Sequence, residues 1–213
     1  MIGEFWPQPK LVAGYHLSDA TDFSGNGRTL TAVGSPSYVL GKFHYCVDFG
    51  TNGNNGLKRT DNAGLDLTAD HAVIGWFLLR ATPASGKQAI VYDNYNATSD
   101  RDIELWITNN SGILNWNLAS GAGQSSVSFS AALNTWHHFA LVQVGSNLYF
   151  YLDGSLLTST SYVYYNYTTT GFFLGGEGSA TGINGQMDES VLIQGTFTSQ
   201  QIRRLYAWAI GKL

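Results

Sequence analysis

Short segments in which apolar and polar residues alternate recur along the chain, and this pattern predicts β-strands. Residues 102–107 (Asp-Ile-Glu-Leu-Trp-Ile) and 113–118 (Ile-Leu-Asn-Trp-Asn-Leu) both alternate without a break. Asn109-Asn110-Ser111-Gly112 between them predicts a four-residue turn in which Thr108 pairs with Ile113. The hairpin then has one wholly apolar face and one face that carries polar and aromatic residues: Asp102, Glu104, Trp106, Asn115 and Asn117.

Further strand-like segments follow at short intervals and are separated by turn residues rather than by helical segments. This spacing favours an all-β fold, a two-sheet antiparallel β-sandwich. Trp136 and Leu141 occupy strand positions that we expect to face its core. A length of 213 residues suits one such domain.

The two ends of the chain differ from this pattern. Residues 1–10 contain Trp6-Pro7-Gln8-Pro9 and predict an extended N-terminal arm, so the sandwich spans 11–198. Residues 199–213 predict one short C-terminal helix and an apolar tail, with Ser199 as the cap and Ile202, Leu205 and Tyr206 on one face. The last apolar residues either fold back onto the sandwich or dock on a partner, which includes a second copy in a homo-oligomer: Trp208, Ile210 and Leu213.

Composition removes several classes of function. Charged residues make up 12%, the formal net charge is −4 and the pI is near 5.6, so we expect no nucleic-acid partner. The apolar segment 72–79 is too short for a membrane span. Cys46 is the single cysteine, so it forms no intrachain disulfide and is expected to be a buried thiol. Residues 1–4 do not begin like a signal peptide, which indicates either a lost signal or a protein that is not exported.

The polar face of the predicted hairpin is the main candidate site. An aromatic ring beside carboxylates and amides suits sugar recognition, and Asp102 and Glu104 share a face, as paired carboxylates do in retaining glycosidases. Three interpretations stay open: a solvated face, a binding face and a catalytic face. No nucleophile elbow or phosphate-binding loop is present in the sequence.

Other residues carry weaker signals. His137 and His138 are strand neighbours that point to opposite faces, so they cannot share one metal ion. The run of tyrosines in residues 162–167 predicts either a binding loop or a strand and turn whose rings pack on their neighbours.

A glycine-rich turn near the N-terminus suits a cation or a self-bonded loop. Asp22, Ser24 and Asn26 alternate in the turn, and Gly27 is free to adopt positive φ. Oxygen-bearing side chains at this spacing suit calcium, and they equally suit a turn whose carboxylate caps its own backbone amides. The EF-hand alternative is excluded, because position 12 is Val33 and no helical pattern flanks the loop.

This turn and several later motifs occur together, in the order found in one known family. The chain resembles the laminin-G-like branch of the concanavalin A-like lectin/glucanase superfamily over residues 11–207. The matching segments are the apolar strand 11–17, the D-x-S-G-N-G turn, Gly41-Lys42-Phe43, Val47-Asp48-Phe49, the Trp-His-His opening at 136–138, residues 148–154, Phe173-Leu174-Gly175-Gly176 and residues 185–190. The resemblance implies a concanavalin A-like jelly roll.

The resemblance also implies ligands and partners. One structural calcium ion would bridge the ends of the sandwich, with Asp22, Asn26 and Asp188 as side-chain ligands and carbonyls near Gly25 and Gly27 completing the shell. Laminarinase-like members carry an E-x-D-x-E strand, but Asp100 stands at the first Glu position here, so the catalytic match is partial. We therefore expect no enzyme activity and no catalytic residue.

The expected function is that of a non-catalytic exterior structural or adhesive protein of a virion. It would be a bacteriophage decoration, tail or fibre component at the virion surface, with other virion proteins or cell-surface glycans as partners. The alternative is a carbohydrate-binding module of a larger secreted, extracellular bacterial protein. A glycoside hydrolase or polysaccharide lyase ranks third, because the acidic constellation is incomplete.

Overall fold

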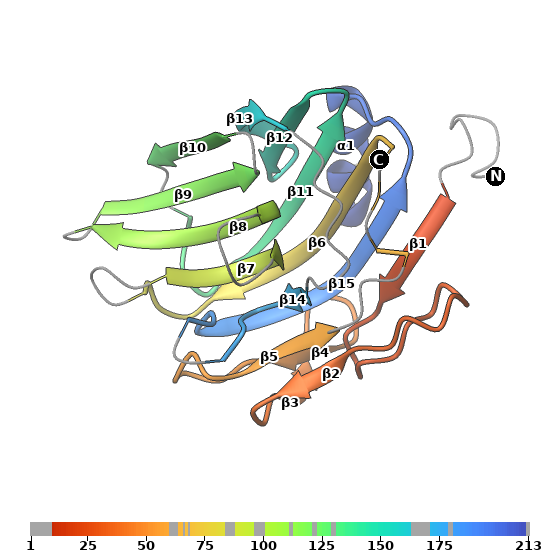
Figure 1. Cartoon of the computed structure of the whole chain (residues 1–213). Coiled ribbons are helices and arrows are strands. Elements are labelled where there is room, and N and C mark those ends of the chain that lie inside the picture. Colours follow the sequence, from red (N-terminus) through yellow and green to blue (C-terminus); the bar gives the residue numbers. More distant parts are fainter. Residues whose placement is uncertain are drawn as a thin grey trace.

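The computed structural model contains fifteen described strands and one described helix (Figure 1). It describes residues 10–59, 64–65, 67, 69–83, 88–95, 101–110, 113–120, 123–128, 131–162, 171–178 and 181–211, without the side chains of 88–95, 101–102, 110, 113–114, 119–120, 123 and 171. The predicted N-terminal arm lies outside these ranges except for Lys10, which begins β1. No helix in the described ranges is long and apolar enough to span a membrane.

Two antiparallel sheets form the sandwich. In sheet A, the strand order is β13-β12-β11-β6-β15-β4-β3, and β1 also pairs with β15. The bounds in sheet A are β1 Lys10–Tyr15, β3 Ser37–Leu40, β4 Tyr45–Asp48, β6 His71–Leu79, β11 Trp136–Val144, β12 Asn147–Leu152, β13 Ser155–Ser161 and β15 Gly185–Gln194.

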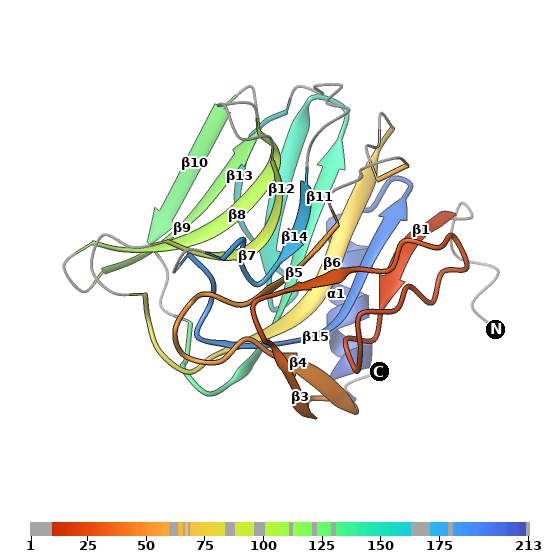
Figure 2. The same ribbon diagram turned by 60° about the horizontal axis from the view of Figure 1, so that its bottom comes forward.

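Sheet B has the order β10-β9-β8-β7-β14-β5-β2. Its bounds are β2 Thr31–Val33, β5 Gly56–Arg59, β7 Gln88–Tyr95, β8 Arg101–Asn110, β9 Ile113–Ser120, β10 Gly123–Ser128 and β14 Gly171–Leu174. Figure 2 shows the two sheets facing each other. These findings confirm the predicted all-β sandwich.

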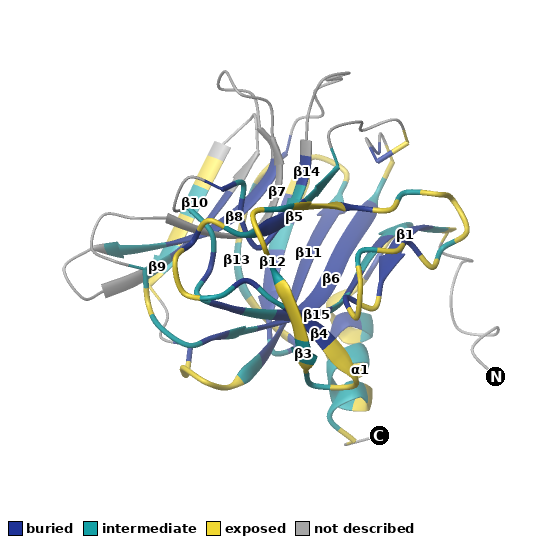
Figure 3. Ribbon diagram, turned by 90° about the horizontal axis from the view of Figure 1, so that it is seen from below, coloured by how far each residue is buried: buried dark blue, intermediate teal, exposed yellow. Residues whose placement is uncertain are grey.

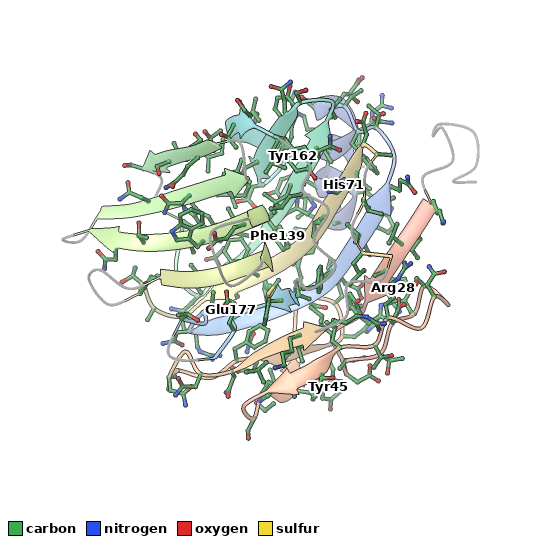
Figure 4. All side chains as sticks on the ribbon, viewed as in Figure 1. Arg28, Tyr45, His71, Phe139, Tyr162 and Glu177 are labelled. Atoms are coloured by element: carbon green, nitrogen blue, oxygen red, sulfur yellow. The ribbon has the colours of Figure 1, made fainter. Side chains whose placement is uncertain are left out.

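The main core fills the space between the sheets, and Phe139 lies there in Figure 4. Leu141 is fully buried in this core, as predicted. Trp136 is only half-buried and is not a member of the core, so that part of the prediction is wrong. The two residues are five apart, and strand alternation therefore places them on opposite faces.

Helix α1 (Ser199–Ala209) lies against the outer surface of sheet A (Figures 1 and 3). It begins one residue earlier than the sequence suggested, because Thr198 is the cap and forms a capping box with Gln201. Ile202 is buried, and Leu205 packs beside it in a second apolar cluster with Ala72, Ile74, Ala140, Val142, Tyr151 and Phe197. The helix thus covers sheet A with the predicted face.

Candidate functional site

The outer face of sheet B carries a row of bonded polar side chains. Strands β8 and β9 pair Asn110 with Ile113 and Thr108 with Asn115, so their register is shifted by two residues from the predicted one. Strand β8 therefore continues to Asn110, two residues beyond the predicted strand end at Thr108. A two-residue shift preserves the faces, and Ile103, Leu105, Ile107, Trp116 and Leu118 all point into the core as expected.

Hydrogen bonds join these polar side chains across three strands. Asn117 donates from Nδ2 to Thr108 Oγ1 at 3.2 Å and accepts at Oδ1 from Ser126 Oγ at 2.5 Å. Ser128 Oγ donates to Asn115 Oδ1 at 2.8 Å. We call this set the polar ladder: Thr108, Asn115, Asn117, Ser126 and Ser128. It fixes the orientation of both amides, so that the face is ordered before any ligand arrives.

Burial divides the predicted site into two parts. Glu104, Trp106 and Asn117 are only 4%, 3% and 5% exposed, which is far from the solvated face that the sequence allowed. Asn115 is half-buried, and Ser126 and Ser128 are exposed. Among the described side chains of the candidate site, the accessible ones therefore lie toward β10, while Trp106 offers little ring surface to a ligand.

Two further acidic residues lie on the strands around Glu104. Asp102 lies in β8, but its side chain lies outside the described part, so its predicted pairing with Glu104 stays a prediction. The register places Asp93 of β7 opposite Glu104 of β8, a position that sequence reasoning missed. Strand β10 was also missed, because Gln-Ser-Ser-Val-Ser has little apolar signal, although its two ladder serines alternate.

The outer face of sheet A has a different chemistry. Trp76 packs against His138 at 5.2 Å and Tyr206 at 5.9 Å between ring centroids, and Lys42 Nζ lies 4.1 Å from its ring centroid. Burial lowers the pKa of His138 to about 4, outweighing the Asp153 charge that opposes this shift. His138 is therefore neutral near pH 7 and part of an aromatic cluster.

His137 faces the opposite side of β11 and has an opposite pKa shift. Burial lowers its pKa, but the bond of Nδ1 to Asp153 Oδ2 at 2.7 Å, the Asp153 charge and the contact of Nε2 with Ala132 O at 3.1 Å raise it overall. Both nitrogens face acceptors, an arrangement that suits the imidazolium form. The two histidines are structural and share no ligand position, as strand geometry predicted.

The Asp22 turn forms the self-bonded alternative. Asp22 Oδ1 accepts from the backbone amides of Gly14 at 3.0 Å and Ser24 at 2.9 Å. Its Oδ2 accepts from Ser24 Oγ at 2.9 Å and the Arg28 amide at 2.8 Å. Burial raises the pKa of Asp22, but these four bonds lower it overall.

This arrangement does not fit the predicted calcium ligands. Asn26 turns its Nδ2 toward the carbonyl of Val12 at 2.9 Å, and Asp188 Oδ2 accepts from the amides of Lys42 and Phe43 at 2.8 and 3.1 Å. No group of three His, Cys, Asp or Glu side chains suits a metal within the described ranges. Calcium binding itself remains a prediction to be tested.

The structure also describes the single cysteine and the first residue of the tyrosine-rich run. Cys46 is fully buried, as expected, and burial raises the pKa of its thiol to about 12. Tyr162 is buried against His71, with ring centroids 6.2 Å apart (Figure 4), whereas residues 163–167 of the tyrosine-rich run lie outside the described part.

Comparison with known proteins places this sandwich in a family. The family model of the "Concanavalin A-like lectin/glucanases superfamily" matches residues 51–203. The chain belongs to this superfamily. A search of curated protein sequences gave no match.

Solved structures agree on this superfamily fold. Domain 4 of AbnA, an extracellular arabinanase from Geobacillus stearothermophilus seen with arabinotriose, has a TM-score of 0.70 and 18% identity, covering 93% of this chain and 98% of the other. The binding domain of botulinum neurotoxin DC with SialylT has a TM-score of 0.71 and 12% identity, covering 94% and 52%. Trypanosoma rangeli sialidase has a TM-score of 0.71 and 17% identity, covering 92% and 32%.

At these identities, the likeness concerns the fold. The chain spans almost the whole arabinanase domain, about half of the toxin binding domain and about one third of the sialidase. The superfamily name includes both lectins and glucanases, so membership alone does not decide between binding and catalysis.

Proposed function

We propose that the chain is a non-catalytic glycan-binding module whose ligand lies along the polar ladder. The observation that carries this proposal is the bonded arrangement across β8, β9 and β10, in which Asn117 and Asn115 are held by serine and threonine hydroxyls. Amides and hydroxyls are suited to the hydroxyl groups of sugars, and fixed side chains lose less entropy when a ligand binds.

The accessible part of the ladder favours a neutral glycan. Asn115, Ser126 and Ser128 offer donors and acceptors without a formal charge. The structural similarity to a domain seen with arabinotriose supports a neutral saccharide as the first ligand to test.

Calorimetric titration with arabinan, β-glucan and galactan oligosaccharides tests this proposal. We expect at least one to bind, and we expect Asn115→Ala to weaken that binding roughly tenfold, because a lost hydrogen bond costs about 1.4 kcal/mol. Asn147→Ala is the matched control, since Asn147 is exposed at the start of β12 in sheet A. Equal affinities of the two variants, or no binding to any of these ligands, would contradict the proposal.

We also propose that the module binds glycans without cleaving them. Glu104 is buried and the strand register places Asp93 opposite it, so these two acidic residues are the pair to test for catalysis. We expect no product release from these polysaccharides by the wild-type protein. Turnover that Glu104→Gln abolishes would show that the module is an enzyme.

We propose the exterior of a virion as the setting, with attachment to other virion proteins and adhesion to cell-surface glycans. Exposed apolar side chains on the β3–β4 hairpin, Leu40 at 78% and Tyr45, support attachment to a larger assembly. Tyr45 lies at the edge of the molecule in Figure 4. The similarity to an extracellular arabinanase domain supports the alternative, a module of a larger secreted protein.

Mass spectrometry of purified particles and of culture medium distinguishes the two settings. The virion proposal predicts the chain in particles that have been washed at high salt. Recovery of the chain only in particle-free medium, as part of a longer polypeptide, would favour the secreted alternative.

A further inference from the structure

Helix α1 presents a second surface with a composition unlike that of the polar ladder. Its buried side is centred on Ile202, whereas Gln200, Arg203, Arg204 and Trp208 are exposed on the other side. Arg204 and Trp208 are one helical turn apart and are therefore neighbours on this surface. Trp208 is 70% exposed, so most of its ring is open to a ligand.

The charge on this surface is unbalanced. The chain has 15 acidic and 11 basic residues in total, yet no Asp or Glu follows Glu189 in the sequence. Neither Arg203 nor Arg204 forms an ion pair with any residue in the described ranges. Two guanidinium groups thus project from α1, and the helix supplies no carboxylate to neutralise them.

We propose that the exposed side of α1 binds an acidic saccharide. A guanidinium group pairs with a carboxylate or sulfate through two parallel hydrogen bonds, and an indole ring packs on the apolar face of a pyranose. Trp208 beside Arg204 offers both contacts within one sugar residue. Charge complementarity selects an anionic ligand, and the ring selects one that also has a flat apolar face.

Other anionic partners fit this surface less well. A membrane requires a broad apolar side, but Trp208 is the one large apolar side chain on the exposed side of α1. Nucleic acid is disfavoured by the net charge of −4. The α1 surface lies on sheet A and the polar ladder on sheet B, so this proposal goes beyond the neutral-glycan site and stands apart from it.

Binding of the whole chain to polygalacturonate, alginate and a sulfated galactan, measured by affinity electrophoresis and calorimetry, tests the proposal. We expect at least one to bind, and we expect Arg204→Gln and Trp208→Ala each to weaken binding by roughly tenfold or more. Lys10→Gln removes the same charge from exposed Lys10 in β1 and should leave the affinity unchanged. Tyr45→Ala is the matched control for an exposed aromatic ring.

Methyl-esterified polygalacturonate has the same sugar without the charge and should bind at least tenfold more weakly. Equal loss in Lys10→Gln would reduce the effect to net charge and overturn the proposal. The absence of binding to any of the three acidic polymers would also overturn the proposal. Binding to vesicles of anionic phospholipid without binding to any of these polymers would do the same. Asn115→Ala should leave acidic-polymer affinity unchanged, so failure at α1 is distinguishable from failure at the polar ladder.

Discussion

The outer faces of the two sheets have opposite chemistry. On the outer face of sheet A, the side chains of β6 and β11 are apolar apart from His138, and helix α1 packs on them through Ile202. On sheet B, the outward side chains of the polar ladder on β8, β9 and β10 are polar and are bonded across the strands. Strands β6 and β11 of sheet A are therefore buried on both faces, while sheet B retains hydrogen-bonding groups that a ligand can use.

The sequence contains this difference. Strand β6 is almost continuously apolar and β11 has the apolar run Phe139–Val142, as strands buried on both faces do, whereas β8 and β9 alternate. Neighbouring histidines on β11 show the same division on a smaller scale. His138, outward beneath α1, has a lowered pKa, and His137, inward beside Asp153, has a raised pKa.

The largest expected effect concerns the cover over sheet A. Ile202→Ala should lower the free energy of unfolding by about 2–5 kcal/mol, because it leaves a cavity in a fully buried cluster. Trp208→Ala on the exposed side of the same helix should change it by less than about 0.5 kcal/mol. Urea unfolding of both variants provides the measurement. Equal losses would mean that α1 does not cover the sheet as described.

The Asp22 turn should also make a substantial contribution. Asp22→Ala removes an acceptor of four hydrogen bonds, and we expect a loss of roughly 2–3 kcal/mol in the presence of chelator. The lowered pKa of Asp22 means that this stabilisation is present above its unfolded-state pKa and is lost as the pH falls through the folded-state value.

Thermal melts with calcium and with chelator test the metal hypothesis on the same turn. A bridging calcium ion would raise the melting temperature of the wild type, and Asp188→Ala would abolish that rise. Coincident melting temperatures would leave the self-bonded turn as the full explanation. Asp19→Ala is a control, because Asp19 is an exposed acid nearby that accepts a hydrogen bond from the Thr21 amide.

Within sheet B, stability and binding should separate along the ladder. Asn117→Ala should cost about 1–2 kcal/mol of unfolding free energy, because Asn117 is buried and bonded to Thr108 and Ser126. Ser128→Ala at the exposed end should cost less than about 0.5 kcal/mol. Urea unfolding distinguishes the two, and a larger loss at Ser128 would contradict the division into a buried and an accessible part.

The smallest expected effect is the pH dependence from His137. Its raised folded-state pKa gives stabilisation that is present below the unfolded-state pKa of about 6.5 and is lost as the pH rises through the folded-state value. Unfolding at pH 5.5 and 8.5 should therefore show a relative gain at pH 5.5 for the wild type over His137→Gln. The lowered pKa values of His71 and His138 act in the opposite direction in both proteins. Parallel pH profiles would exclude the His137–Asp153 pair as the source.

Some features of the two sheets follow from the local sequence pattern, and others do not. Alternation identified the apolar face of β8 and β9, because a period of two assigns faces whatever the register. The register and the burial of Glu104 and Trp106 depend on where the strands end and on segments distant in sequence, which local pattern does not encode. The order of motifs predicted the sandwich, but the D-x-S-G-N-G motif fits both a bonded turn and a metal site at Asp22.

Amide chemical shifts during titration with the tightest-binding neutral oligosaccharide test the polar ladder most directly. We expect the largest shifts in β9 and β10, at residues 113–120 and 123–128, while the amides of α1 at residues 199–209 remain unchanged. Asn115→Ala should reduce the β9 and β10 shifts at equal ligand concentration, and Asn147→Ala should not. Shifts confined to α1 or to the β3–β4 hairpin would contradict glycan binding on sheet B.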